Sequence, residues 1–516
     1  MDNLKKRSVL ILDFGSQYTQ LIARRVRENY VFSEVLPPNT TLKTIMRINP
    51  KAIILSGGPS SVFSKNAPIF DKNILSMDIP ILGICYGLQL LVHHNGGKVT
   101  SGLGGEYGFA EVTFSQTYDI TKNMSPKSKV WMSHMDQVTS VPENWEVISK
   151  SSNGVIAALI NKDQSRIATQ FHPEVSHTEE GKALLKNFLF SIAKCEKNWT
   201  PNNFIDEQIK RINSEIKKDN ILVGVSGGVD STVMACMINN VVGKRCYAVL
   251  IDHGLLRKGE AKQCVDSLRD GLGINIHLHD ESEIFFSRLK GVVDPEKKRK
   301  IIGDQFIQSF DRIADEIGEY KFLGQGTLYP DLIESGVSAG NSSHLIKSHH
   351  NVGGLPKNLQ FKLIEPLKDL FKDEVRAVGK ELHIPSELIN RHPFPGPGLG
   401  VRIIGEITRE RVSILQNADS IFIQILKDTG EYENIWQAFA VLIPVKTVGV
   451  MGDQRTYENL VALRAVTSVD GMTADWYKMP YEILSLVSNQ IVNNVSGVNR
   501  VVYDITSKPP GTIEWE

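Results

Sequence analysis

The feature that most constrains the fold of this chain is the run Ser226-Gly227-Gly228-Val229-Asp230-Ser231. It follows the apolar and mostly β-branched residues 221–225, which predict a buried strand. Residues 232–238 after it predict the beginning of a helix. Together these parts form an anion site, because unpaired N–H groups and the helix dipole favour negative charge there. The common phosphate loop is excluded, since no G-x-x-x-x-G-K followed by Ser or Thr occurs in the sequence.

The order Ser-Gly-Gly-x-Asp-Ser resembles the PP-loop of the ATP-pyrophosphatases, adenine nucleotide alpha hydrolase-like enzymes that split ATP into AMP and pyrophosphate. The resemblance implies that residues 226–231 bind ATP, that Asp230 holds Mg²⁺ against the phosphates, and that Ser226 and Ser231 add hydroxyl donors. Lys372 is either a surface charge on a helix or a lid lysine that meets the phosphates. For the loop taken alone, an ordinary glycine-rich turn is the alternative.

Composition limits the class of protein. Lys plus Arg and Asp plus Glu each number 58, so the net charge gives no argument for nucleic acid or an anionic membrane as partner. The five cysteines include no C-x-x-C pair, which argues against a disulfide framework or a zinc cluster and fits a reducing compartment. No apolar run approaches membrane-spanning length. We therefore expect a soluble cytoplasmic protein without nucleic-acid or membrane partners.

Short apolar runs alternate with longer helical patterns along the chain, which predicts parallel α/β units. A polar stretch near residue 200 and a proline-rich stretch at 391–400 divide the chain into residues 1–198, 199–391 and 392–516. An amphipathic helix is predicted at 204–218, with Ile205, Ile209, Ile212 and Ile216 on one face. The predicted strands are 8–12, 52–55, 81–84, 167–171, 221–225, 246–251, 274–278, 321–324, 440–445, 460–467 and 500–505, and a further helix is predicted at 484–495.

Cys85 lies between two glycines, at the end of the predicted strand 81–84 and the beginning of a helix. This is the arrangement of a nucleophile elbow, in which a strained turn presents the reactive side chain above the sheet. A helix N-terminus there raises the thiolate fraction. A buried structural thiol is the alternative for Cys85 alone.

His172 and Glu174 end another predicted strand. In an extended segment, residues two apart point to the same side, so His172 can face the thiol while Glu174 orients its imidazole. Ser56-Gly57-Gly58-Pro59 follows a third strand and offers backbone N–H groups suited to an oxyanion hole. A structural histidine is the alternative for His172 alone.

Residues 8–195 resemble the class I, triad-type glutamine amidotransferases in their G-x-C-x-G and H-P-E elements. The resemblance implies that Cys85 attacks the glutamine carboxamide, that His172 transfers protons and that Glu174 fixes His172. Gly58 and Tyr86 would supply oxyanion N–H groups. The two expected glutamine contacts are Asp136 and Gln89. Asp136 ends the segment Ser-His-Met-Asp, in which Met135 stands where the family usually has glycine. For Gln89, a position on the helix surface is the alternative.

A glutaminase supplies ammonia, and an adenylating loop supplies a way to use it: ATP converts a carbonyl oxygen into an AMP ester that ammonia displaces. The whole chain resembles the glutamine-hydrolysing GMP synthetases, most clearly in residues 391–400, 448–453 and 507–516. In that family the three segments are a glutaminase domain, an ATP-pyrophosphatase domain and a C-terminal α+β domain. The last pairs two subunits, which implies a homodimer here. Residues 347–354 are interpreted as a loop that covers the phosphates.

The same resemblance implies which residues contact the substrate xanthosine monophosphate (XMP). Arg and Lys suit its phosphate, while Gln and Glu can hydrogen-bond sugar or purine edges. For the basic run 294–300, which contains Arg299, a solvated surface is the alternative to a binding role. For Asp331, a surface position is the alternative. The implied contacts are Arg299, Asp331, Gln437, Arg500, Lys508, Ile513 and Glu514.

Three other functions remain to be separated from this one. An NAD synthetase would share the adenylating loop but typically carries a different glutaminase domain. A carbamoyl-phosphate or CTP-type synthase would share the glutaminase but release ADP and phosphate. A catalytically silent nucleotide-binding regulator would commonly lose groups such as Cys85, His172, Glu174 and Asp230, all of which are present.

Overall fold

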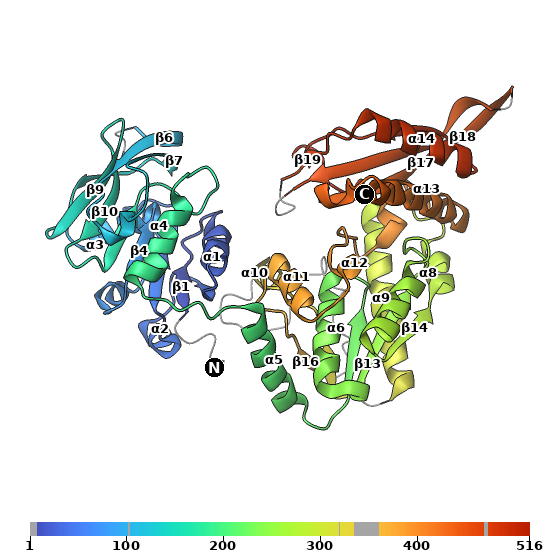
Figure 1. The fold of residues 1–516 in the computed structure, drawn as a ribbon, viewed down its shortest axis with the longest axis horizontal. Helices are drawn as coiled ribbons and strands as arrows, with labels where there is room; N and C mark the ends of the chain where they lie inside the picture. The colour runs from blue at the N-terminus through green and yellow to red at the C-terminus, as the bar shows by residue number, and fades with distance from the viewer. Residues whose placement is uncertain (1–7, 102–103, 319, 335–360, 452, 469–472) are drawn as a thin grey trace. The chain divides into compact units, whose positions relative to one another are not determined.

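The computed structural model describes residues 8–101, 104–318, 320–334, 361–451, 453–468 and 473–516 (Figure 1). The described residues form two units, one up to Glu207 and one from Gln208 onward. The division falls inside helix α5 (Pro201–Ile216), the helix predicted at 204–218. Ile205, Ile212 and Ile216 of its predicted apolar face are buried, whereas Ile209 is 36% exposed.

The first unit is built on a nine-stranded sheet of order β2-β1-β3-β4-β11-β10-β9-β6-β7. Strands β1 (Val9–Leu12), β3 (Ala52–Leu55), β4 (Ile81–Ile84) and β11 (Arg166–Thr169) run parallel with one another. The first three are buried along their whole length, as the central strands of a covered parallel sheet are. The remaining elements of this sheet and its helices are β2 (Ser33–Leu36), α1 (Thr19–Arg27), α2 (Leu42–Ile48), α3 (Tyr86–His94) and α4 (Gly181–Asn187).

The other half of this sheet is antiparallel and was not predicted. Two of its strands, residues 106–114 and 127–134, place buried side chains in alternation with more exposed ones, as one-sided antiparallel strands do, so they contain no continuous buried run. A third, residues 156–161, is apolar and mostly buried but was also missed. These strands are β6 (Glu106–Phe114), β7 (Lys127–His134), β9 (Trp145–Ser151) and β10 (Ile156–Asn161), and a separate pair is formed by β5 (Lys98–Thr100) and β8 (Gln137–Ser140).

The second unit contains a five-stranded parallel sheet of order β14-β13-β12-β15-β16. The four predicted strands of this region are confirmed within two residues at each end. The strands are β12 (Ile221–Val225), β13 (Cys246–Asp252), β14 (Ile276–Asp280), β15 (Phe322–Gly324) and β16 (Lys362–Ile364). Its helices are α6 (Val229–Val242), α7 (Glu260–Asp266), α8 (Ser282–Leu289), α9 (Pro295–Ile317), α10 (Tyr329–Glu334), α11 (Lys372–Glu381) and α12 (Ser386–Ile389).

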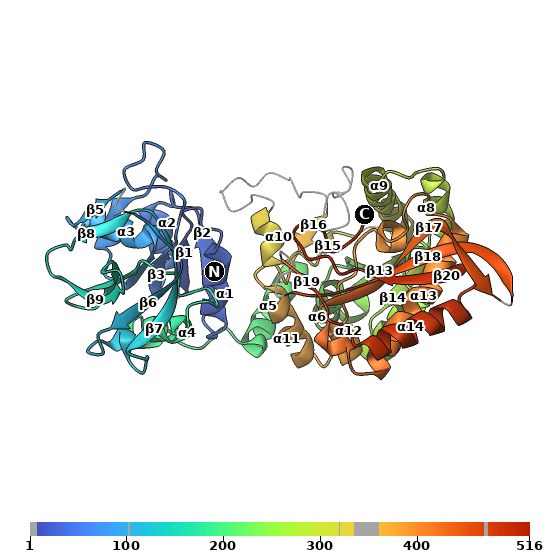
Figure 2. The ribbon, with the colours of Figure 1, turned by 90° about the horizontal axis from the view of Figure 1, so that it is seen from above.

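A second sheet of this unit joins β17 (Gln437–Met451), β18 (Gln454–Thr467), β19 (Asp475–Trp476) and β20 (Val498–Tyr503). Helix α13 (Arg409–Asp428) packs on β17, and α14 (Tyr481–Asn494) packs on β20 and on α13 (Figure 2). The sequence predicted α14 but missed α13. Strands β17 and β18 are also much longer than the predicted 440–445 and 460–467.

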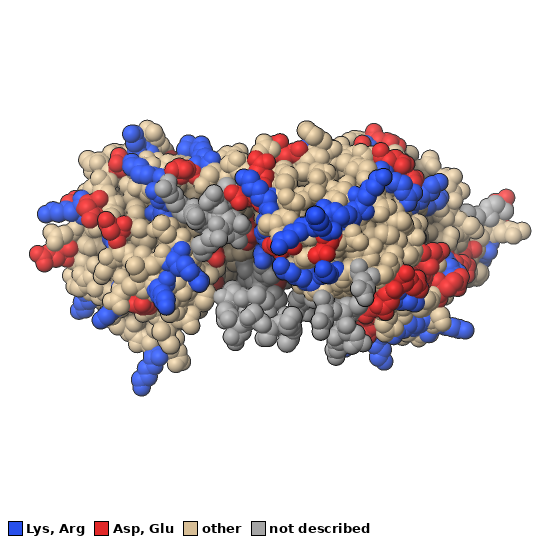
Figure 3. All heavy atoms as spheres, turned by 90° about the horizontal axis from the view of Figure 1, so that it is seen from below, with Lys and Arg blue, Asp and Glu red and all other residues tan. Residues whose placement is uncertain are grey.

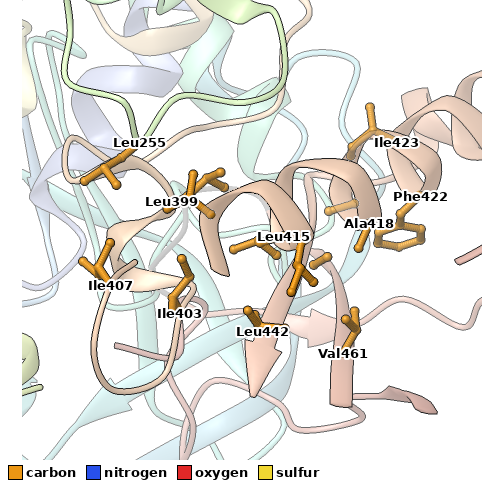
Figure 4. Packing of buried hydrophobic residues seen from close by; sticks show 14 of the residues in the cluster. Leu255, Leu399, Ile403, Ile407, Leu415, Ala418, Phe422, Ile423, Leu442 and Val461 are labelled. Atoms are coloured by element: carbon orange, nitrogen blue, oxygen red, sulfur yellow. The ribbon is translucent and has the colours of Figure 1, made fainter. Parts of the chain in front are cut away.

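One hydrophobic cluster connects the two sheets of the second unit. Leu415, Ala418 and Phe422 of α13 meet Leu442 and Val461 of the second sheet (Figure 4). The same cluster continues through Leu255, Leu399, Ile403 and Ile407 to side chains of β12 and β13. The segment after residue 391 therefore shares its core with the five-stranded sheet, which explains why the two belong to one compact unit.

The described surface carries charges of both signs. Lys and Arg side chains lie among Asp and Glu side chains on the face seen in Figure 3, in keeping with the equal totals of 58. Among the residues that the structure describes, none of the helices combines the length and the apolar composition needed to cross a bilayer. The predicted α/β class is confirmed in both units.

Candidate functional site

Cys85 occupies a strained turn between β4 and α3. Its backbone φ is +52° and its ψ is −101°, a conformation that costs a non-glycine residue free energy and marks nucleophile elbows. The flanking glycines are needed for close packing. A Cβ atom on Gly87 would lie 2.4 Å from the carbonyl oxygen of Leu55, and one on Gly83 would lie 2.5 Å from that of Gly87. The G-x-C-x-G pattern therefore brings α3 against the sheet.

Replacing Gly87 with alanine is expected to destabilise the first unit by about 1–3 kcal/mol, because an added methyl group has no room against the backbone of β3. Urea unfolding measures the change. Gly303→Ala in α9 is the control, since a Cβ there meets no atom within 4 Å and alanine favours a helix. Equal stabilities of the two variants would contradict the packing argument.

His172 and Glu174 lie beside the thiol. The Nδ1 atom of His172 is 2.8 Å from Oε1 of Glu174, and the His172 imidazole also hydrogen-bonds the Cys85 sulfur. All three side chains are buried. Strand β11 ends at Thr169, so the predicted extension to residue 171 is wrong, and so is the argument from strand alternation. A turn after β11 brings His172 and Glu174 together instead.

Two opposing effects set the protonation of His172. Burial disfavours the imidazolium, but the Glu174 carboxylate and the contact with Cys85 outweigh it and raise the pKa of His172 from 6.5 to about 10. The imidazolium is therefore favoured at neutral pH. It places a positive charge beside the Cys85 sulfur.

Replacing Glu174 with glutamine is expected to lower the pKa of His172, because the carboxylate is lost while burial remains. In the parent protein the raised pKa stabilises the fold fully below about pH 6.5, and this contribution disappears as the pH rises to about 10. The variant loses the contribution throughout that range. An NMR titration of the His172 ring measures the pKa directly, and an unchanged titration would contradict the assignment to Glu174.

The predicted oxyanion and glutamine residues surround the same turn. A Cβ on Gly58 would lie 2.6 Å from the carbonyl oxygen of Phe14, so only glycine fits there. Tyr86 opens α3, where backbone N–H groups lack helical partners. Gln89 is buried, which excludes a helix-surface position, and its Nε2 donates to the carbonyl oxygen of Asp136 at 3.2 Å.

The Asp136 carboxylate is held by the hydroxyl of Ser61 at 2.6 Å. Met135, which stands where the family usually has glycine, is 61% exposed and does not have a positive φ. Its side chain therefore points to solvent and leaves the backbone of the turn unstrained.

The sequence missed Gln170 and the main chain of Ser133, which both contact the Cys85 sulfur. A single glutamine at the end of an apolar strand carries no recognisable pattern, and a carbonyl group carries none at all. The one available signal is position, because Gln170 stands two residues before His172.

Residues 226–228 connect β12 to α6, which begins at Val229, three residues earlier than predicted, so Asp230 and Ser231 lie in the first turn of the helix. Gly227 has a φ of +75°, and the N–H group of Ser226 donates to the hydroxyl of Ser231 at 3.1 Å. Ser231 donates in turn to the carbonyl oxygen of Gly228 at 3.1 Å. The loop is thus closed by its own serines, and the N-terminus of α6 opens beside it. Backbone N–H groups at this position suit an anion.

Asp230 and Lys372 meet at this loop. Lys372 Nζ is 2.5 Å from Oδ2 of Asp230, while the other oxygen, Oδ1, is buried and has no hydrogen-bond partner among the described residues. Arg391 donates to the carbonyl oxygen of Gly227 at 2.8 Å and pairs with Glu260. The lid position of Lys372 is therefore compatible with the structure. Residues 347–354 lie outside the described residues.

Four of the predicted XMP contacts come from α9, β17 and residues 513–514. Gln437 donates to Oε1 of Glu514 at 2.8 Å, and Arg299 donates to the main-chain oxygen of Glu516. Ile513 is buried against the side chains of β17. Gln437, Ile513 and Glu514 therefore lie together. Arg299 contacts Glu516, two residues after Glu514, in the segment 504–516, here called the tail.

The tail is anchored by three cations whose side chains are fully buried: Lys298, Arg402 and Arg464. Arg402 donates to both carboxylate oxygens of Glu514, at 3.0 and 2.8 Å. Arg464 pairs with Asp504 at 3.2 Å, and Lys298 pairs with Glu516. The alternative for the basic run 294–300 was a solvated surface. Lys298, in the first turns of α9, is instead buried.

Three predicted contacts lie elsewhere or have a structural task. Arg500 stands opposite Leu460 on β18, whereas Gln437 stands opposite Val466, so the two are about 20 Å apart along the strand. Asp331 accepts from the N–H group of Leu328 at 2.9 Å, as a helix-capping carboxylate does. The backbone of Lys508 pairs with that of Ala474.

Family models match three parts of the chain. A model described as glutamine amidotransferase class-I matches residues 10–192, one described as PP-loop domain matches residues 201–284, and one described as GMP synthase C terminal domain matches residues 424–515. The first contains the Cys85 turn, the second the loop at 226–231, and the third the anchored tail.

The chain is also similar over its full length to curated proteins named as glutamine-hydrolysing GMP synthases. The protein from Brachyspira hyodysenteriae is 53% identical, with 98% of this chain and 99% of the relative covered. The protein from Pelodictyon phaeoclathratiforme is 54% identical, and that from Thermosipho melanesiensis is 53% identical; each match covers 99% of this chain and 100% of the relative. The chain therefore belongs to the glutamine-hydrolysing GMP synthase family.

Proposed function

We propose that the chain catalyses the ATP-dependent amination of XMP to GMP with ammonia from glutamine, releasing AMP, pyrophosphate and glutamate. The observation that carries this function is the presence in one chain of the Cys85–His172–Glu174 arrangement and the PP-loop at residues 226–231. The Cys85 site supplies ammonia. The PP-loop supplies the AMP ester of the purine oxygen, from which ammonia displaces AMP.

In the glutaminase reaction, Cys85 attacks the carboxamide carbon of glutamine. His172, held by Glu174 through Nδ1, protonates the leaving ammonia from its other ring nitrogen. The N–H groups of Gly58 and Tyr86 stabilise the negative oxygen of the tetrahedral intermediate. Gln89 and Asp136 are proposed to contact the amino-acid end of the substrate. Their mutual hydrogen bond gives that side of the site a fixed shape.

In the synthetase reaction, the backbone of residues 226–231 and the hydroxyls of Ser226 and Ser231 receive the ATP phosphates. The 2 oxygen of the purine attacks the α-phosphorus, and pyrophosphate leaves. Lys372 can exchange its contact with Asp230 for the phosphates, because both side chains are partly exposed.

Asp230 is the proposed ligand of Mg²⁺. Its unpartnered Oδ1 has lone pairs free for a hard cation, and one carboxylate plus substrate phosphates is a usual way to hold Mg²⁺. No group of three or more His, Cys, Asp or Glu side chains that could hold a metal occurs among the described residues. When bound, Mg²⁺ neutralises negative charge on the phosphates.

For XMP, we propose that Arg299 and Lys508 serve the phosphate and that Gln437, Ile513 and Glu514 contact the purine or sugar. Asp331 and Arg500 have less support, since Asp331 caps a helix and Arg500 lies about 20 Å along β18 from Gln437. Arg500 is compatible with this role if it serves the site of a second subunit.

We also propose the division into a glutaminase domain (1–198), an ATP-pyrophosphatase domain (199–391) and a C-terminal domain (392–516) that forms a homodimer. Six apolar side chains exposed on or beside β17, β18 and β20 support this dimer surface: Val445, Val448, Val450, Tyr457, Val502 and Ile505. Light scattering on the purified chain tests the dimer. The five free, buried cysteines support a cytoplasmic location.

Product analysis tests the proposed function most directly. Purified protein supplied with XMP, ATP, Mg²⁺ and glutamine is expected to form GMP, AMP, pyrophosphate and glutamate in equal amounts. ADP and phosphate in place of AMP and pyrophosphate would contradict the assignment of the loop. Nicotinic acid adenine dinucleotide in place of XMP serves as the control for an NAD synthetase.

A further inference from the structure

A buried amide beside the Cys85 sulfur has no task in the reaction described above. Gln170 follows β11 directly and is fully buried. Its Nε2 lies 3.7 Å from Cys85 Sγ, and its Oε1 has no hydrogen-bond partner among the described residues. Leaving a buried oxygen without a partner is unfavourable, so the orientation of this amide calls for a reason.

The main chain fixes this contact. The N–H group of Cys85 donates to the carbonyl oxygen of Thr169 at 2.7 Å, and Thr169 immediately precedes Gln170. The N–H group of Gln170 donates to Ala157 at 2.8 Å, where the pairing of β10 is irregular. The backbones of Cys85 and Gln170 are therefore held at the same strand end, which keeps the amide within reach of the sulfur.

The neighbours of the sulfur favour opposite protonation states. The carbonyl oxygen of Ser133, 3.5 Å from Sγ, can only accept and therefore favours the thiol. The Nε2 group of Gln170 can only donate and therefore favours the thiolate. The titratable group that faces the sulfur is His172, with Glu174 behind it and His134 of β7 acting on the same ring. Gln170 is thus an uncharged donor in this set.

We propose that Gln170 is a positioning residue for glutamine hydrolysis: its amide holds the Cys85 sulfur toward His172 and stabilises the sulfur when it is negatively charged. The unpartnered Oε1 agrees with this task, because the orientation that aims Nε2 at the sulfur leaves the oxygen without a hydrogen bond among the described residues. The inference rests on the proposed nucleophilic role of Cys85.

The test compares the parent protein with Gln170→Met, which keeps the length of the side chain but removes the donor. Iodoacetamide labelling of Cys85, followed by mass spectrometry across a pH series, measures thiolate formation. Burial raises the pKa of Cys195, Cys236 and Cys264 to about 11 and that of Cys246 to about 12, so Cys85 is labelled selectively near neutral pH.

In Gln170→Met, labelling at neutral pH is expected to be about tenfold slower, with its midpoint at higher pH, since a hydrogen bond to a charged group is lost. The kcat for glutamine-dependent GMP formation should fall by about the same factor with little change in KM. Ammonium-dependent formation should not change. In Gln170→Glu, labelling should be slower still, because a carboxylate beside the sulfur repels the thiolate.

Gln208→Met is the matched control, because Gln208 of α5 is also a buried amide with an unpartnered Oε1. A labelling profile for Gln170→Met that coincides with that of the parent would overturn the proposal. If Gln170→Met does not fold, Gln170→Glu has the same shape as the parent side chain, and the same comparison decides. A shifted labelling profile with unchanged glutamine turnover would also overturn the proposal, because the amide would then act on the sulfur without serving hydrolysis. Failure of the nucleophilic role itself would appear separately, as full glutamine turnover in Cys85→Ala.

Discussion

Replacing Cys85 with alanine is expected to reduce glutamine-dependent GMP formation by about 10⁴-fold or more, while ammonium-dependent formation keeps the parental rate. In the proposed reaction the sulfur forms the bond to the carboxamide carbon, and alanine offers no nucleophile. The turn itself should survive, because the strained backbone is set by the packing of Gly83 and Gly87 against the sheet. The residues proposed for adenylation belong to the second unit, so the proposed adenylation does not need the thiol.

The measurement is GMP formation with glutamine and with ammonium chloride as alternative nitrogen sources. Cys195→Ala is the control, since Cys195 is a second buried cysteine of the same unit and its pKa is raised to about 11 by burial. It should retain both activities. If Cys85→Ala lost both activities in a folded protein, the separation into an ammonia-producing and an ammonia-using site would be wrong.

Replacing Asp230 with asparagine is expected to lower GMP formation from both nitrogen sources by about 10²–10³-fold, because both depend on adenylation of XMP. Asparagine has the shape of aspartate but lacks the charge that would hold Mg²⁺. The substitution also removes the ion pair with Lys372. Glutamine hydrolysis without XMP and ATP should be unaffected, since the Cys85 site is not changed.

Pyrophosphate release, followed over a range of Mg²⁺ concentrations, measures this loss. The variant should require more Mg²⁺ than the parent if Asp230 is a ligand. Asp270→Asn, at an exposed aspartate of the same unit, serves as the control for charge alone. A variant that lost only glutamine-dependent synthesis would contradict the assignment of the loop to ATP.

The parts of the fold that could be predicted are those in which local sequence decides burial. Strands β3, β4 and β12 were predicted with the correct ends, because buried parallel strands appear as continuous apolar runs. Strands β6 and β7 were missed because their apolar residues alternate with exposed ones. Helix α13 was missed although its apolar face is a main part of the core in Figure 4.

In the candidate sites, too, the residues that could be predicted are those marked by a short local pattern. Short patterns such as G-x-C-x-G and Ser-Gly-Gly-x-Asp-Ser place Cys85 and Asp230 at strand ends, and the topology then brings distant strand ends together. Spacing along the chain does not report the register of β20 on β18, so it could not separate Arg500 from Gln437. It could not show either that Glu514 is already paired with Arg402.

The three buried cations that anchor the tail also set an order of assembly during synthesis. Arg402, Arg464 and Lys298 find their carboxylate partners in residues 504–516, which the ribosome adds after the rest of the second unit. Leaving a buried cation without its partner costs about 3–5 kcal/mol, so this unit gains its full stability only when the tail is present. By contrast, the ribosome has added Cys85, His172 and Glu174 once it reaches Glu174, long before the tail. A chain ending at Tyr503 should therefore retain a folded glutaminase while its second unit melts at a clearly lower temperature, which calorimetry would detect.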